Sequence, residues 1–328
     1  MKILFIGGTG IISSACSQLL SQNSEIELFV LNRGKSNRFL PRNVKSITAD
    51  IRNVGEVKNA IDGLSFDVVV EWLAFNEEHI QNDIDIFTGK VKHFVFISSA
   101  SVYQTPLTYP VTEENPAINP HWKYSQEKIA CEELLTKVYL EASFPVTIVR
   151  PSHTYDETML PFTGGYTVVN RMLKGKKVIV HGDGSSLWTL TNSKDFAKGF
   201  VPLLGNENTI GETYHITGDE WQSWDQIFNN VATAFGTKAD IIHIPSDFIN
   251  QFDKEWGAGL LGDKSVSMIF DNSKIRQVVP DFKSTIPYIE GVKSVAKWFQ
   301  EDASRQVINE ELDLLMDQII EAFHSTKT

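Results

Sequence analysis

Short apolar runs alternate with amphipathic stretches along the first half of this chain, and this alternation constrains its fold more than any other feature. The apolar runs, rich in branched and aromatic residues, are 2–6, 27–31, 44–48, 67–70, 93–97 and 146–150. The stretches with helical spacing between them are 11–21, 54–64, 77–87 and 125–142. Strands separated by helices of this length pair in parallel through right-handed crossovers. The sequence therefore predicts an α/β fold with a parallel sheet.

The apolar pattern and the second half of the chain set the predicted architecture. Residues 68–70 and 94–97 are apolar at consecutive positions, which is typical of a sheet covered on both faces. After about residue 150, prolines, glycines and aromatic residues lose this regular spacing. We predict a Rossmann-type doubly wound parallel sheet over residues 1–155 and a smaller C-terminal substrate-binding domain over 156–328, with some later segments returning to the first. A helix over 306–323 would dock on its own domain or form a dimer contact.

Composition and charge argue against several classes of protein. The chain has 30 basic and 41 acidic residues, a net charge of −11, so no broad nucleic-acid or anionic-membrane surface is expected. The apolar runs are too short for a membrane span or a secretory signal, which favours a cytoplasmic location. Two cysteines, Cys16 and Cys131, cannot form a disulfide framework, and the histidines lack metal-ligand spacing, so no metal is expected.

A glycine turn, Gly7-Gly8-Thr9-Gly10, joins the first predicted strand to the first predicted helix. Glycines let the backbone turn tightly and approach a pyrophosphate, and the helix N-terminus offers free N–H groups and a positive dipole end. Ser13 stands where a third glycine is common, and it is small enough for the helix to pack near the strand. The pattern predicts a dinucleotide-binding turn. The residues expected to contact the cofactor here are Gly7, Gly10, Ile11 and Ile12.

The segment after the second predicted strand indicates which dinucleotide binds. An acidic residue there would bind the ribose hydroxyls and repel a 2′-phosphate. This chain has Asn32, followed by Arg33 and Lys35, whose charges can pair with that phosphate. NADP is therefore favoured over NAD, although Arg33 stacked on adenine would suit either. Asp50 and Ile51, after the third predicted strand, are expected beside the adenine, and the alternative for Asp50 is an ordinary helix cap.

Tyr124 and Lys128 stand four residues apart on one face of a predicted helix. A neighbouring ammonium group stabilises a phenolate and lowers the pKa of the phenol. Ser99 ends the fifth predicted strand, and ligands of open α/β sheets bind beyond such strand ends. These residues form a candidate catalytic set. The structural alternatives are a strand-end cap for Ser99 and a half-buried aromatic for Tyr124.

The chain resembles the extended short-chain dehydrogenases/reductases of the NAD-dependent epimerase/dehydratase group over about residues 1–200. The segments that carry the resemblance occur in the same order as in the family, at residues 7–10, 50–53, 98–103, 124–128, 149–151 and 182–184. Residues 214–218 extend the match. The resemblance implies that Tyr124 transfers a proton, that Lys128 holds the nicotinamide ribose and lowers the tyrosine pKa, and that Ser99 binds the reacting oxygen. It also implies that Pro151 lies against the nicotinamide.

Two departures from the family concern the substrate. The dehydratases carry an Asp-Glu pair where this chain has Ala100 and Ser101, a loop more similar to that of the epimerases. Nucleotide-sugar enzymes usually have an arginine after the Gly-Asp-Gly segment to grip the diphosphate, and here that residue is Trp188. Its indole could stack on a sugar or an apolar ring, or belong to the core. Arg171 or Lys174 could supply the missing charge.

Further residues are expected near the cofactor or the substrate. His153 follows the sixth predicted strand and is a candidate for the pocket wall, together with Ala100, Ser101 and Trp188. Glu71 and Trp72 end the fourth predicted strand and could also face the cofactor. Leu73 and Ala74 follow them and complete the expected cofactor-binding set.

Three functions are compatible with these residues. The first is an NAD(P)-dependent epimerase or dehydratase that transfers a hydride at a carbinol or carbonyl carbon of a sugar-like or nucleotide-sugar substrate. The second is a one-way NADPH-dependent ketone or aldehyde reductase. The third is a cofactor-bound RNA-binding or regulatory protein, which the acidic charge and the complete Ser–Tyr–Lys set disfavour. We expect a small-molecule substrate, no nucleic-acid or membrane partner, and a homodimer as in related enzymes.

Overall fold

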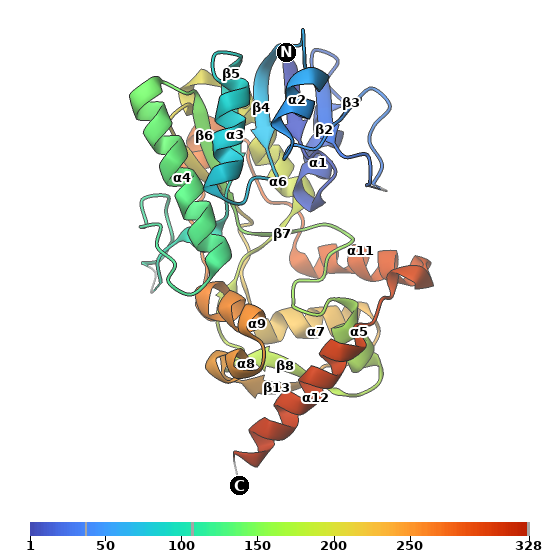
Figure 1. The fold of residues 1–328 in the computed structure, drawn as a ribbon. Coiled ribbons are helices and arrows are strands. Elements are labelled where there is room, and N and C mark those ends of the chain that lie inside the picture. The colour runs from blue at the N-terminus through green and yellow to red at the C-terminus, as the bar shows by residue number, and fades with distance from the viewer. Residues whose placement is uncertain (37, 106–107, 327–328) are drawn as a thin grey trace.

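A parallel sheet forms the upper part of the molecule in the computed structural model, which describes residues 1–36, 38–105 and 108–326 (Figure 1). Within these ranges seven strands pair in the order β11-β6-β5-β4-β1-β2-β3. The strands are β1 (Lys2–Ile6), β2 (Glu27–Asn32), β3 (Lys45–Thr48), β4 (Phe66–Glu71), β5 (Val91–Ile97), β6 (Val146–Pro151) and β11 (Thr213–Ile216). The strand order reverses between β1 and β4, so the carboxyl ends of these two strands border a ligand-binding crevice. The predicted doubly wound α/β architecture is confirmed.

Helices cover both faces of this sheet. One face carries α1 (Ile11–Leu20), α6 (Ser193–Phe200) and α10 (Ser273–Val278), and the other carries α2 (Val54–Ala60), α3 (Glu77–Phe87) and α4 (Lys123–Ala142). Phe5 packs in one core with Cys16 and Phe200. Leu4, the preceding residue, packs in the other core with Cys131. Because neighbouring side chains of a strand point to opposite faces, consecutive apolar residues fill two cores at once.

Two helices that pack on the sheet differ from their predicted bounds by two residues or more. The predicted helix over 54–64 ends at Ala60, because the chain then turns through Gly63, which has a positive φ of 71°. Its N-cap is Asn53, whose side chain accepts a hydrogen bond from the Glu56 amide at 3.2 Å. The predicted helix over 125–142 begins at Lys123, so its first turn already contains Tyr124.

The lower part of the molecule has a separate core. Its strands are β7 (His153–Tyr155), β8 (Lys177–His181), β9 (Leu187–Trp188), β10 (Leu190–Asn192), β12 (Gln222–Ser223) and β13 (Asp240–Ile244). Its helices are α5 (Tyr166–Leu173), α7 (Trp224–Ala234), α8 (Ser246–Phe252), α9 (Lys254–Gly259), α11 (Tyr288–Glu301) and α12 (Glu310–Ser325). Short helical turns lie at Ala100–Val102, Val201–Leu203, Glu207–Thr209, Leu260–Lys264 and Ala303–Arg305. The chain leaves the sheet after Pro151, the last residue of β6, and returns to it with α6, β11 and α10.

The C-terminal helix α12 docks on the lower core of its own chain. Met316, Ile319 and Ile320 are buried there. The helix begins at Glu310, later than the predicted residue 306, because Asn309 caps it by accepting a hydrogen bond from the Leu312 amide at 3.0 Å. Among the described residues, no helix combines the length and apolar character needed to cross a membrane.

Candidate active site

A cavity of about 810 Å³ opens at the carboxyl ends of the sheet strands and extends to the lower core. The predicted site residues that line it are Gly7, Gly10, Ile11, Ile12, Asn32, Arg33, Asp50, Ile51, Leu73, Ser99, Ala100, Ser101, Tyr124, Lys128, Pro151, His153 and Trp188. Ala74 does not line the cavity in the described structure, and its backbone carbonyl instead accepts a hydrogen bond from Lys128. Residues 1–155 thus supply most of the lining. The part of the cavity beside the glycine turn is called the cofactor half below. The part lined by residues from later segments is called the substrate half, and these residues include Trp188, Asp263, Lys264, Met268 and Phe270.

The glycine turn leaves room that any larger residue would fill. Gly7 has a φ of 85°, and a Cβ atom on it would lie 2.6 Å from the Leu73 side chain. A Cβ atom on Gly8 would lie 2.6 Å from Val30 of β2. The Ser13 hydroxyl accepts a hydrogen bond from the Gly10 amide at 2.8 Å, so this serine helps to begin α1. The free N–H groups of the first helical turn therefore border the cavity, as phosphate binding requires.

The residues that follow β2 and β3 line the cofactor half of the cavity. The Asn32 side chain accepts a hydrogen bond from the Gly34 amide at 2.8 Å and so shapes the turn that presents Arg33. Arg33 is exposed to solvent, and it lines the cavity together with Lys35. Asp50 accepts a hydrogen bond from the Arg52 amide at 3.0 Å, and Asn53, not Asp50, caps the next helix.

Tyr124 and Ser99 are joined in a chain of hydroxyl groups. Ser99 lies at the end of β5, hydrogen-bonds the Tyr124 phenol, and contacts the Ser101 hydroxyl at 2.9 Å. Ser125 donates a hydrogen bond to Ser101 at 2.7 Å. Ser99 also caps the Ala100–Val102 turn by accepting a hydrogen bond from the Ser101 amide at 3.2 Å, so its capping role and its place in the cavity coexist. Burial raises the pKa of Tyr124, and the hydrogen bond to Ser99 opposes that rise.

Lys128 lies one helical turn after Tyr124, and only 2% of it is exposed. Its Nζ atom donates to the carbonyl oxygens of Ala74 at 2.7 Å and Ile97 at 2.8 Å, and it lies 5.9 Å from the centre of the Tyr124 ring. Burial lowers its pKa to about 8. Its helix is held against β6 by a buried ion pair between Glu132 and Arg150.

Two buried carboxyl groups lie behind the cofactor half of the cavity. Glu71 ends β4 and accepts a hydrogen bond from the Leu73 amide, and its carboxyl group interacts electrostatically with that of Asp83 of α3. Both residues are fully buried. Burial raises the pKa of Glu71 to about 7. Burial and the neighbouring Glu71 raise the pKa of Asp83 well above its usual range, so the pair holds a proton at neutral pH.

Asp83→Asn is expected to stabilise the fold at alkaline pH. A carboxyl whose pKa rises on folding makes the fold less stable as the pH rises from the unfolded value, 4.5 for Glu71, through its folded value of about 7. The amide cannot ionise, so it never places a second negative charge beside Glu71. We expect the free energy of unfolding, measured in urea, to rise by about 1–3 kcal/mol at pH 8 and by less at pH 5. Asp85→Asn, at an exposed position of α3, is the control, and a destabilised Asp83→Asn at pH 8 would contradict this account.

The substrate half of the cavity has an indole, that of Trp188, at the position where the family resemblance leads one to expect an arginine. Trp188 is 4% exposed, and its ring packs 5.5 Å from that of Trp224 in the lower core, so it belongs to the core and to the cavity wall. Arg171 does not supply the missing charge, because it is buried and paired with Asp313 and Asp317 of α12. Lys174, also proposed for this role, is exposed and does not line the cavity.

Sequence reasoning missed Asp263 and Lys264, which face the substrate half from the Leu260–Lys264 turn. The Lys264 ammonium lies 3.3 Å from an Asp263 carboxylate oxygen and 5.2 Å from the centre of the Trp122 ring. The backbone of this turn is fixed, because Asn119 donates to the Gly262 carbonyl and Trp224 to the Lys264 carbonyl. A local sequence pattern could not have found these residues, since their partners are distant in the chain.

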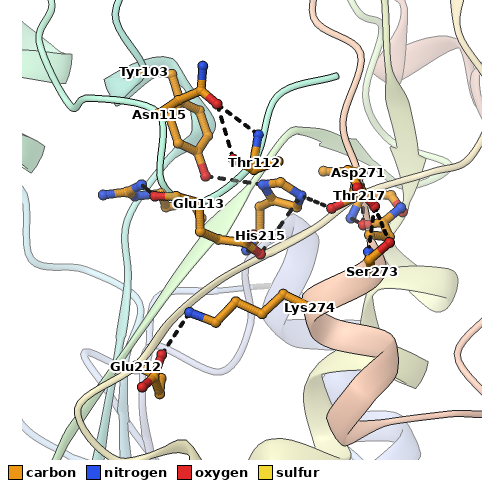
Figure 2. A network of polar contacts seen from close by, with 12 residues as sticks. Tyr103, Thr112, Glu113, Asn115, Glu212, His215, Thr217, Asp271, Ser273 and Lys274 are labelled. Atoms are coloured by element: carbon orange, nitrogen blue, oxygen red, sulfur yellow. Dashed lines mark hydrogen bonds and ion pairs between the residues drawn. The ribbon is translucent and has the colours of Figure 1, made fainter. Parts of the chain in front are cut away.

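The segment that carries Phe270 is held by the polar network in Figure 2. His215 of β11 is fully buried, and its ring nitrogens contact the Tyr103 hydroxyl at 3.1 Å and the Asp271 carbonyl oxygen at 2.7 Å. The His215 amide donates to Glu113 at 3.0 Å. The network therefore joins the loop after β5, the edge strand β11 and the substrate wall in one rigid unit.

Comparisons with known proteins agree with this geometry. A sequence model of the NAD dependent epimerase/dehydratase family matches residues 3–217. The chain is 25% identical over 266 residues to the chloroplast stem-loop binding protein of 41 kDa b from Arabidopsis thaliana, covering 75% of this chain and 67% of that one. It is 20% identical over 295 residues to 2′-dehydrokanamycin reductase from Streptomyces kanamyceticus, covering 86% and 80%. An epimerase structure from Methanothermobacter thermautotrophicus has the same fold, with a TM-score of 0.75, 17% identity and coverage of 93% and 94%.

Proposed function

Because the chain belongs to the NAD dependent epimerase/dehydratase family, we propose that it transfers a hydride between NAD(P) and a carbinol or carbonyl carbon of a sugar-like substrate. The observation that carries this proposal is the meeting of Ser99, Tyr124 and Lys128 in the cavity that the glycine turn also lines. In the oxidising direction, Ser99 holds the substrate hydroxyl and Tyr124 takes its proton as the C–H bond gives up its electron pair. The base is the Tyr124 phenolate, which becomes the phenol on accepting this proton, and the Lys128 cation stabilises the phenolate before the transfer.

The described residues fit a dinucleotide. The space at Gly7 and Gly8, which a Cβ atom would fill, suits a pyrophosphate at the N-terminus of α1. In this proposal Lys128 holds the nicotinamide ribose, Pro151 lies against the nicotinamide, and Asp50 and Ile51 border the adenine; all four residues line the cavity, which supports these roles. The bound nicotinamide supplies the hydride acceptor, and the residues of this chain orient the substrate and move its proton.

NADP is proposed as the preferred cofactor. The position of the ribose-binding acid holds Asn32, and Arg33 with Lys35 offers two cations beside it. Arg33→Ala should weaken NADP(H) binding by about 1–3 kcal/mol, because it removes a charged hydrogen bond, and should leave NAD(H) binding nearly unchanged. Fluorescence titration of both cofactors measures this, with Arg42→Ala, an exposed residue outside the cavity, as the control. Tighter binding of NAD(H) by the wild-type protein would overturn the proposal.

Epimerisation and one-way reduction are separated by the nucleotide that co-purifies with the protein. Epimerisation returns the hydride to the same substrate, so a retained oxidised cofactor supports it. An empty protein that NADPH fills reversibly supports reduction, which the similarity to 2′-dehydrokanamycin reductase also favours. Absorbance and mass of the released nucleotide distinguish the two.

The partners and the cellular location of the protein need separate tests. The similarity to a stem-loop binding protein raises RNA as an alternative ligand. The net charge of −11 opposes it, and a gel-shift titration with stem-loop RNA at physiological salt would detect such binding. A homodimer and a cytoplasmic location remain predictions, which sedimentation and cell fractionation can test.

A further inference from the structure

We propose that the substrate is a compact hydroxylated ring without a nucleotide diphosphate, selected by Asp263, Lys264 and Trp188. This inference rests on the proposed function, since it names the substrate class of the same site. It departs from the nucleotide-sugar substrates that the family resemblance suggests. Three independent features of the cavity support it: its charge, its buried polar atoms without partners, and its shape.

The charge of the substrate half does not suit a diphosphate. Among the described lining residues, Lys264 is the one cation outside the segments assigned to the cofactor. Its ammonium already lies 3.3 Å from Asp263, whose carboxylate would repel a phosphate. A diphosphate is normally held by several charge-assisted hydrogen bonds, and Arg171 is committed to Asp313 and Asp317. Binding a diphosphate would therefore leave most of its charge unpaired.

The buried polar atoms of the cavity favour a substrate with neutral hydrogen-bonding groups. In the described part of the chain, the Trp188 indole N–H and the His153 Nε2 atom are buried without hydrogen-bond partners, and both residues line the cavity. Burial, with the nearby Lys264 charge, lowers the pKa of His153 to about 3, so its ring is neutral at pH 7. Hydroxyl groups both donate and accept hydrogen bonds, and they match a neutral imidazole and an indole N–H.

The shape of the substrate half suits a small ring. Trp122, Trp188, Met268 and Phe270 give it flat apolar walls, on which the C–H face of a ring can pack. The whole cavity, about 810 Å³, lies in the range of about 300–1,000 Å³ that holds one drug-sized ligand. It must hold the dinucleotide as well, so only part of this volume is left for the substrate, which favours a small ring.

Matched substrates test this inference. The NADP⁺-loaded enzyme is assayed for hydride transfer with glucose, galactose and N-acetylglucosamine, each supplied as the methyl glycoside and as the UDP derivative. We expect kcat/KM for at least one methyl glycoside to exceed that of its UDP derivative tenfold or more. Equal or faster turnover of the UDP derivatives would overturn this inference and leave the proposed function standing. If no pair of compounds supports hydride transfer, the proposed function itself fails.

A matched pair of variants tests whether Lys264 contacts the substrate. Lys264→Met removes the cation of the substrate half of the cavity, whereas Lys274→Met removes a lysine of α10 that pairs with Glu212 outside the cavity. Tryptophan fluorescence reports binding of the preferred glycoside to the NADP⁺-loaded enzyme, because Trp122 and Trp188 line its site. We expect Lys264→Met to raise the glycoside Kd and KM about tenfold, with NADP⁺ affinity unchanged, and Lys274→Met to change neither. An unchanged glycoside Kd in Lys264→Met would overturn the claim that Lys264 helps to bind the glycoside.

Discussion

Tyr124→Phe is expected to lower kcat on the preferred substrate by about 100-fold or more, the usual effect of losing a general acid–base group. The substitution keeps the ring that packs 4.9 Å from Trp122 and 6.4 Å from Phe75, and it removes only the hydroxyl that hydrogen-bonds Ser99. Cofactor affinity should therefore hardly change. Initial rates and a fluorescence titration of the cofactor measure the two effects.

Tyr139→Phe provides the matched control for this experiment. Tyr139 lies on the same helix, α4, and does not line the cavity, so its variant should keep wild-type turnover. Near-normal turnover of Tyr124→Phe would mean that another residue moves the proton. The proton-transfer role that the family resemblance implies for Tyr124 would then be wrong.

Lys128→Met is expected to impair both chemistry and cofactor binding. The cation lies 5.9 Å from the Tyr124 ring, and burial has lowered the pKa of Lys128 to about 8, so it is charged at pH 7. Removing it should raise the apparent pKa of Tyr124 in the pH–rate profile, which moves the rise in activity to higher pH. Loss of the proposed charged hydrogen bond from Lys128 to the ribose should raise the cofactor Kd about tenfold to hundredfold.

A lysine elsewhere on α4 controls for the substitution itself. Lys137 is exposed and lies outside the cavity, so Lys137→Met should leave the pH profile and the cofactor Kd unchanged. If Lys128→Met shows a wild-type pH profile, Lys128 does not set the pKa of Tyr124. Weaker cofactor binding alone would then limit its role to holding the ribose.

Local patterns were sufficient to predict the sheet and its glycine turn. Consecutive apolar residues such as 68–70 reach two cores because both faces of the sheet are covered. The glycine turn is encoded in four adjacent residues, and Gly7 needs its positive φ there. Tyr124 and Lys128 share a helix face by their spacing, which is a local property.

Contacts between distant segments could not be predicted in the same way. Asp263 and Lys264 reach the cavity because Asn119, more than a hundred residues earlier, holds the carbonyl of Gly262. Arg171 looked available for a phosphate, and only the tertiary structure shows that Asp313 of α12 binds it. The pairing of Glu71 with Asp83 likewise depends on how α3 packs on the sheet, and no motif marks it.

A single-turnover experiment tests the central claim, hydride transfer to a nicotinamide beside Tyr124, most directly. The NADP⁺-loaded enzyme is mixed rapidly with its preferred substrate, with hydrogen or deuterium on the reacting carbinol carbon, and the absorbance of reduced nicotinamide is followed. The account predicts that reduced nicotinamide forms within the first turnover and that deuterium slows its formation. Product that forms without reduced nicotinamide, and at the same rate from the deuterated substrate, would contradict it.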